Sequence, residues 1–211
     1  KERIGQLLSR GSGGGRIPVP VRNDMERNRY RPMIEFLYTG DLPAEVKQEA
    51  KELKELLLLA NAFAIEAMTS AVAQALSQAM TLELAIDAMQ WLPKTKATES
   101  CLETVHRIIV DEYKNVGMDS KKIPFDKLPL DAVLLVLQSN QLQADSENRV
   151  WRAARFWVAQ NKPTEDDALR VLSTIRLHNI THNFLADFVV HDDVFVSKDS
   201  PRRHTLYNPM M

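Results

Sequence analysis

The chain has 211 residues, of which 45% are hydrophobic and 26% charged, a composition typical of a globular protein with one or two domains. Its 27 basic and 28 acidic residues give a formal net charge of -1, so the charge does not favour nucleic acid or an anionic membrane as a partner. The longest apolar run, residues 56–60, is far too short to cross a bilayer.

Cys101 is the only cysteine, so no intramolecular disulfide can form, and we expect a reducing setting in the cytoplasm or the nucleus. The N-terminus is charged and glycine-rich, without an apolar central region, which predicts no signal peptide. Because the chain begins with Lys1 and not with Met, we expect it to be part of a longer protein whose first residues are absent.

The N-terminal part predicts a loop, then a strand, then a helix. Residues 11–15 are a glycine cluster, which predicts a loop. Ile17, Val19 and Val21 alternate with period two and predict a strand, and the prolines between them restrict it to a sheet edge. A helix should then run from about residue 25 to Gly40, which can adopt the positive φ that closes a helix.

The middle of the chain predicts two consecutive helices. Apolar residues from Val46 to Ala60 recur every three or four positions, with alternating Glu and Lys on the other face, as in an amphipathic helix with a solvated side. The next helix, residues 65–80, is rich in Ala and apolar almost all round, which indicates that it is buried.

The second half predicts helix after helix, with spacing too irregular for a tandem repeat. The predicted helices cover residues 82–92, 98–116, 132–138, 146–161, 165–173 and 181–190. Their three tryptophans are expected in the core, with Trp151 more exposed than Trp91 and Trp157.

The run from Ile34 to Leu42, Ile-Glu-Phe-Leu-Tyr-Thr-Gly-Asp-Leu, is followed by a helix rich in Leu and Ala. This order of residues, followed by such a helix, resembles the BTB (POZ) domain, a protein-interaction fold. The resemblance implies a truncated α/β BTB domain over residues 1–77, without the early elements that build the usual homodimer. A homodimer would therefore need elements upstream of Lys1.

A second signature follows, in the order Leu128-Pro129, Ser139-Asn140-Gln141-Leu142, Ser146-Glu147, Val150, Trp157 and Ile175-Arg176-Leu177. It resembles the BACK domain, the helical region that follows BTB in many proteins. The implied fold is mainly α: a partial BTB domain, an all-helical BACK domain over residues 78–195, and a polar tail or linker over residues 196–211. The stretch from Gln90 to Pro93 is most similar to plant or algal BTB–BACK proteins.

The resemblance implies an adaptor that binds cullin-3 and recruits a substrate, of unknown identity, for ubiquitin transfer. It points to Leu7, Leu8 and Phe63 as contacts for cullin-3. The alternative for Leu7 and Leu8 is an ordinary core position, and the alternative for Phe63 is burial within the domain.

Three departures from the family pattern keep a second function open. The dimerisation elements are absent, the glycine loop lacks the apolar-x-Glu motif for cullin contact, and no Kelch, MATH or ankyrin module is present. The alternative is a structural or scaffolding component of a larger assembly without a ligase role.

No convergent catalytic set is evident, so we expect no enzyme activity, no cofactor and no metal. His178 and His182 have the i,i+4 spacing of zinc helices, but they lack a third ligand, and a new helix could begin between them. Cys101 and His106 are five residues apart and do not face each other on one helix, as a nucleophile and its base must.

Overall fold

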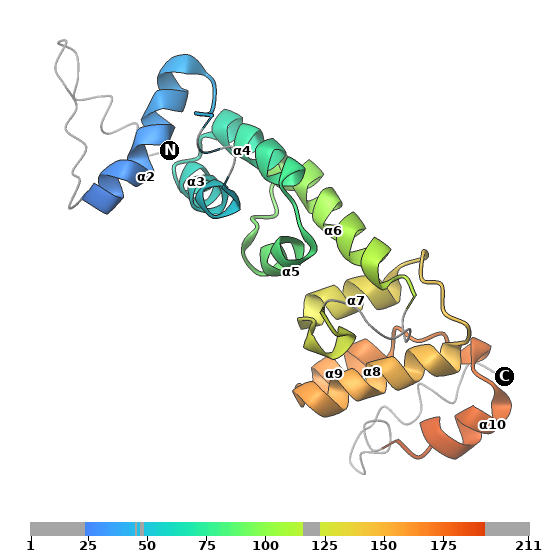
Figure 1. The fold of residues 1–211 in the computed structure, drawn as a ribbon. Helices are drawn as coiled ribbons and strands as arrows, with labels where there is room; N and C mark the ends of the chain where they lie inside the picture. The colour runs from blue at the N-terminus through green and yellow to red at the C-terminus, as the bar shows by residue number, and fades with distance from the viewer. Residues whose placement is uncertain (1–23, 45, 47–48, 116–122, 193–211) are drawn as a thin grey trace. The chain divides into compact units, whose positions relative to one another are not determined.

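The computed structural model describes residues 24–44, 46, 49–115 and 123–192, and these residues are mainly helical and contain no β-strand (Figure 1). The strand predicted around Val19 lies outside the described residues. The chain divides into two compact units, Lys1–Ile108 and Ile109–Met211, and the division falls inside the helix α6 (Glu99–Tyr113). Within the described residues, no helix is long and apolar enough to span a membrane.

Except for the start of α3, the α-helices of the first unit begin and end close to the predicted positions. The helices of this unit are α2 (Asp24–Thr39), α3 (Ala50–Ala62), α4 (Glu66–Gln78), α5 (Leu82–Trp91), the short 3-10 helix η2 (Lys96–Thr98) and the N-terminal part of α6.

The prediction that Gly40 closes α2 is confirmed. Its φ is +77°, and its N–H donates to the carbonyl oxygen of Phe36 at 2.8 Å. Such a left-handed residue satisfies a carbonyl at the end of a helix and strongly favours glycine. The helix also passes through Pro32, which has no N–H to donate.

Helices α3 and α4 pack against each other and carry the core of this unit (Figure 1). The predicted inward residues of α3, including Leu53, Leu57 and Ala60, are fully buried. The helix starts later than predicted, because Glu49 is extended and leaves Val46 buried ahead of the first turn. Helix α4 is buried along one side only, by residues that include Met68.

Caps at both ends explain why α5 was correctly predicted. The Thr81 hydroxyl accepts a hydrogen bond from the N–H of Leu84, which satisfies one of the free donors of the first turn. Leu92 is extended and is followed by Pro93, which ends the helix.

The second unit contains α7 (Leu130–Gln138), α8 (Glu147–Asn161) and α9 (Glu165–Leu172), with the C-terminal end of α6. Short helical turns complete it: η3 (Phe125–Lys127), η4 (Leu177–Asn179), α10 (His182–Phe184) and the π-helical turn η5 (Leu185–Val189). Helix α9 packs against both α7 and α8.

The expected exposure of Trp151 was wrong. Only 3% of Trp151 is exposed, as for Trp157, whereas Trp91 is half-buried. The buried side of α8 is wider than a single line of residues and contains Val150, Trp151 and Ala154 together. Because positions three and four apart share a helix face, Trp151 and Trp157 both point into the core.

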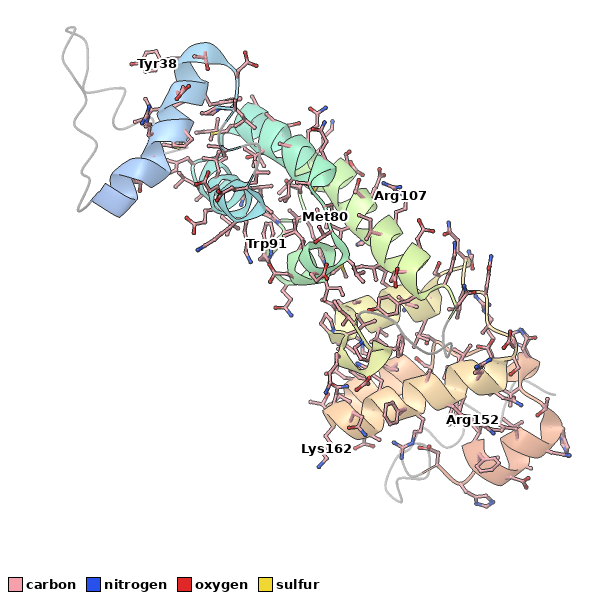
Figure 2. The ribbon with its side chains drawn as sticks, in the orientation of Figure 1. Tyr38, Met80, Trp91, Arg107, Arg152 and Lys162 are labelled. Atoms are coloured by element: carbon pink, nitrogen blue, oxygen red, sulfur yellow. The ribbon has the colours of Figure 1, made fainter. Side chains whose placement is uncertain are left out.

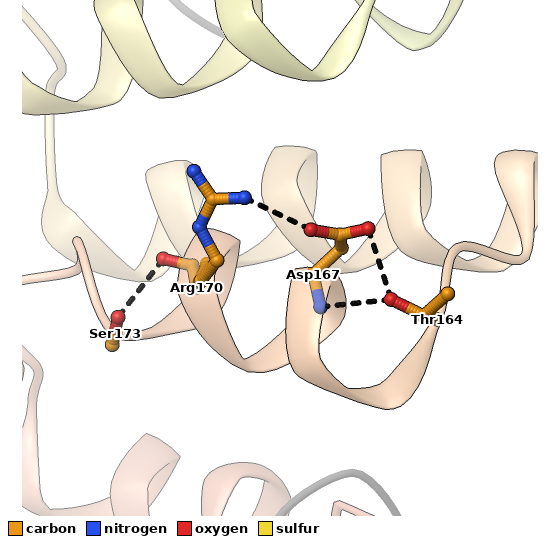
Figure 3. A network of polar contacts seen from close by, with 4 residues as sticks. All are labelled: Thr164, Asp167, Arg170 and Ser173. Atoms are coloured by element: carbon orange, nitrogen blue, oxygen red, sulfur yellow. Dashed lines mark hydrogen bonds and ion pairs between the residues drawn. The ribbon is translucent and has the colours of Figure 1, made fainter.

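Helix α9 is held by a polar network along its outer side (Figure 3). The Thr164 hydroxyl accepts from the N–H of Asp167 at 3.2 Å and lies 2.9 Å from its carboxylate. The other carboxylate oxygen accepts from Arg170 at 3.0 Å. This N-cap and the acidic first turn compensate the positive end of the helix dipole.

Candidate protein-interaction surfaces

Helix α2 exposes three large apolar side chains. Ile34 is 38% exposed, Leu37 57% and Tyr38 88%, and Figure 2 shows Tyr38 at the C-terminal end of the helix. Tyr30, Ile34 and Tyr38 recur every four residues, and Leu37 lies next to them, so all four lie along one side of the helix. We call these four residues the α2 stripe. An exposed apolar line of this kind is a candidate contact surface for another protein.

The predicted interaction residue Phe63 lies at one end of the α2 stripe. Its ring meets Tyr30 edge to face, with the ring centroids 6.2 Å apart and an interplanar angle of 80°. Phe63 is half-buried, so it both packs within the unit and keeps part of its ring accessible. Its contact with cullin-3 stays a prediction. Leu7 and Leu8 lie outside the described residues.

A left-handed turn holds Phe63 in this position. The next residue, Ala64, has a φ of +55°, and the N–H of Ile65 donates to the carbonyl oxygen of Ala60 at 2.9 Å. This hydrogen bond closes the end of α3 in the way that a glycine usually allows. The turn joins α3 to α4 and thereby fixes the ring of Phe63 beside α2.

Three residues fasten α5 to α3 at the surface of the first unit. Lys54 donates to the Asp87 carboxylate at 2.6 Å, the indole N–H of Trp91 donates to the same oxygen at 2.8 Å, and the Lys54 ammonium lies 4.7 Å from the Trp91 ring centroid. The hydrogen bond from Lys54 holds the pKa of Asp87 below its ordinary value, against a smaller opposing effect of burial. Because the pair is partly exposed, its contribution to stability is modest.

The signature residues of the second unit bind one another and form its framework. The indole N–H of Trp157 donates to the carbonyl oxygen of Leu128 at 2.9 Å. The Glu147 carboxylate accepts from the backbone N–H of Arg176 at 2.9 Å, and the Arg176 side chain reaches the carbonyl oxygen of Ser139 at 3.4 Å. Their spacing in the sequence therefore reflects contacts that hold the fold of the second unit.

His178 and His182 do not share a helix. His178 lies in η4, His182 begins α10, and the extended backbone of Ile180 separates them. Asn148 of α8 holds this break, because its side chain donates to the Thr181 hydroxyl at 2.9 Å and accepts from the Thr181 N–H at 3.1 Å. Within the described residues, no group of three or more His, Cys, Asp and Glu side chains could hold a metal ion.

Cys101 and His106 both lie on α6, and neither is arranged for nucleophilic chemistry. Burial raises the pKa of the Cys101 thiol, against a lowering effect of the hydrogen bond with Ser77. Burial lowers the pKa of His106, and the nearby charge of Lys94 adds to this effect. At neutral pH the cysteine is therefore a buried thiol and not an activated thiolate.

The outer side of α8 carries an aromatic and cationic cluster that the sequence analysis did not single out. Phe156 is 53% exposed, and Arg152, labelled in Figure 2, is exposed one turn earlier on the same helix face. The Arg152 guanidinium lies 5.2 Å from the ring centroid of Phe184, which stacks on Phe188 at 4.9 Å. The sequence does contain a signal for this cluster, because Phe156 is a large apolar residue on the polar side of the predicted helix, in line with Arg149 and Arg152.

Comparison with known proteins agrees with this architecture. Residues 94–190 match the family model described as BTB And C-terminal Kelch (BACK). The chain is also 26% identical over 176 residues to human Kelch-like protein 26, an alignment that covers 83% of this chain and 27% of that protein. Residues 94–190 are therefore similar to the BACK domain, and the longer alignment shows similarity to a Kelch-like protein.

The BACK match begins at residue 94, within the region predicted to be BACK-like, and includes Leu128, Glu147, Trp157 and Arg176 of the second signature. The expected fold class, mainly α with an all-helical BACK region, is confirmed for that region. The truncated BTB domain and the expected relation to plant or algal proteins stay predictions. The chain spans only about a quarter of the length of Kelch-like protein 26, given the 27% coverage.

Proposed function

We propose that this chain is a non-enzymatic protein-interaction adaptor, and that it serves as a substrate-recruiting subunit of a cullin-3 RING ubiquitin ligase. The observation that carries the proposal is the BACK match over residues 94–190, preceded by the BTB-like run from Ile34 to Leu42. The proposed organisation is a partial BTB domain over residues 1–77, a BACK domain over 78–195 and a tail over 196–211. We propose the cytoplasm or the nucleus as its location.

The surface of the first unit supports a contact with another protein. The α2 stripe and Phe63 together offer an apolar line with two aromatic rings in edge-to-face contact at one end. Aromatic side chains at the centre of an interface commonly supply most of the binding free energy. Cullin-3 would bury this line against an apolar surface of its own.

A pull-down with purified cullin-3 tests the ligase part of the proposal. The bait is the full-length protein with any residues that precede Lys1, at micromolar concentration. We expect it to retain cullin-3, and we expect Phe63→Ala and Tyr38→Ala to weaken retention by about tenfold each, the loss of one interface anchor.

Phe156→Ala is the matched control, because Phe156 is an exposed aromatic residue of the second unit. It should leave the retention of cullin-3 unchanged. A full-length protein that fails to retain cullin-3 would refute the ligase role.

A scaffolding component of a larger assembly is the second candidate. It is favoured by the exposure of Ile34, Leu37 and Tyr38, since a permanent subunit buries such residues against its neighbours. It predicts that the purified chain is poorly soluble alone and is recovered in a fixed ratio with other proteins. A soluble monomer of the purified chain would count against this candidate.

A further inference from the structure

We propose that the outer side of α8 and the adjoining turn η5 form a docking site for an acidic peptide segment that carries an apolar anchor residue. The α8–η5 surface consists of Arg152 and Phe156 of α8, Phe184 of the short helix α10 that leads into η5, and Phe188 of η5. This inference concerns the second unit and does not depend on cullin-3 binding.

The α8–η5 surface is continuous. Arg152 and Phe156 are one turn apart on α8, Arg152 lies over Phe184, and Phe184 stacks on Phe188. Phe184 is buried and anchors the cluster, whereas Phe156 and Phe188 are 53% and 57% exposed. A guanidinium over one ring of an aromatic cluster can bind a carboxylate while the exposed rings of the cluster contact an apolar side chain.

The electrostatics of α8 select an acidic partner. Of its three arginines, Arg149 pairs with Asp145 and Arg155 pairs with the buried carboxylate of Asp192. Within the described residues, Arg152 forms no ion pair, and its guanidinium lies 5.2 Å from the ring centroid of Phe184. A carboxylate of the ligand could accept hydrogen bonds from the Arg152 guanidinium and form an ion pair with it.

Neither the carboxylate of Glu147 on α8 nor that of Asp187 on η5 forms an ion pair with Arg152. Glu147 accepts from the backbone N–H of Arg176. Asp187 is exposed. Among the residues that the structure describes, Arg152 therefore has no carboxylate partner beside the exposed aromatic rings, and charge complementarity favours an acidic segment over a neutral apolar one.

The arginine that pairs with Asp192 also contributes to the site. The Arg155–Asp192 pair ties the chain just after η5 to α8, and Phe188 of η5 stacks on Phe184, over which Arg152 lies. The site is thus built on a regular helix of fifteen residues and held by a partly buried ion pair. The helix holds Arg152 and Phe156 one turn apart before binding, which lowers the conformational entropy lost when a peptide binds.

Fluorescence anisotropy with an array of labelled peptides tests the proposal on the full chain. Each peptide has about ten residues, rich in Glu, with one Leu, Ile, Phe, Tyr or Trp as the anchor. A second array replaces every Glu by Gln, and a third replaces the anchor by Ser. We expect at least one peptide of the first array to bind, and both replacements to weaken that binding by about tenfold or more.

Two variants locate the binding. Arg152→Glu and Phe156→Ala should each weaken peptide binding by about tenfold. A higher salt concentration should weaken peptide binding to the wild type but not to Arg152→Glu. Arg107→Glu is the matched charge reversal, because Arg107 is exposed on α6 without an ion pair among the described residues (Figure 2). Tyr38→Ala is the matched aromatic truncation.

The remaining outcomes refute the proposal. They are the absence of binding in the first array, equal binding of the Gln array, or equal losses in Arg107→Glu and Arg152→Glu. Circular dichroism and thermal unfolding of each variant separate lost binding from lost folding. Self-association that Phe156→Ala abolishes would assign the surface to a second copy of the chain and also refute the acidic-peptide site.

Discussion

At the scale of single residues, the second signature is explained by hydrogen bonds to the backbone. Trp157 donates to the carbonyl oxygen of Leu128, which is 29 positions earlier, and Glu147 accepts from the N–H of Arg176, which is 29 positions later. Each hydrogen bond satisfies a backbone donor or acceptor that folding removes from water and that would otherwise stay unpaired at a cost in stability. These residue types are needed because Trp combines a large apolar body with one donor, and Glu offers acceptors.

His106 gives a prediction at the same scale. Burial lowers its pKa in the folded protein below the ordinary value of 6.5. As the pH falls through 6.5, the unfolded chain takes up a proton that the folded protein resists, so stability is lost from 6.5 down to the folded pKa. His106→Gln should therefore lose less free energy of unfolding than the wild type between about pH 7.5 and about pH 5.5.

Urea unfolding at the two pH values measures this difference. His182→Gln is the control, since His182 is exposed on α10, and it should keep the wild-type pH dependence. If His106→Gln and the wild type lose equal free energy of unfolding between the two pH values, His106 is not the cause of the pH dependence.

At the scale of elements, the helices whose ends carry caps or breakers were predicted most closely. Helix α5 lies between Thr81 and Pro93, and α8 ends at Asn161, as predicted. Helix α3 was predicted to start too early because apolar periodicity alone does not distinguish a buried residue before a helix from one inside it. Val46 is buried but precedes α3, because Glu49 is extended.

The N-cap of α9 gives the prediction at this scale. Thr164→Ala removes the acceptor of the Asp167 N–H and should lower the free energy of unfolding by about 1 kcal/mol. Thr164→Ser keeps the oxygen and should restore most of that loss. Thermal or urea unfolding of the full chain is the measurement.

Ser173→Ala is the matched control at the other end of the same network (Figure 3). The Ser173 hydroxyl donates to the carbonyl oxygen of Arg170 and caps no free N–H, so its removal should cost less than that of Thr164. An equal cost for both variants would show that the N-cap is not the main support of α9.

At the scale of the whole molecule, the chain forms two compact units, and the division lies inside α6. The second unit uses the C-terminal end of that helix. The Tyr113 hydroxyl donates to the carbonyl oxygen of Ile123 at 2.7 Å, and the Lys114 carbonyl oxygen accepts from the N–H of Gln143 at 2.6 Å. The last residue of α6 and the residue that follows it therefore support the fold of the second unit.

Two fragments test this dependence. A fragment of residues 94–192 keeps all of α6, whereas a fragment of residues 109–192 keeps only its last turn or so, too short to be a stable helix alone. We expect the longer fragment to unfold cooperatively and to resist proteolysis, and the shorter one to lose helicity by circular dichroism beyond the residues removed. Equal stability of both fragments would show that α6 is dispensable for the second unit.

The sequence by itself determined the helical class, most helix boundaries and the order of the two signatures. These follow from periodicity, caps and breakers, which act over a few neighbouring residues. Only the tertiary structure decided which faces stay exposed, because exposure depends on segments distant in the chain. It buried Trp151, joined Phe63 to the α2 stripe, and brought Arg152 of α8 over Phe184 of α10. Local patterns show which residues can form a surface, but the packing of helices distant in the sequence decides which of them do.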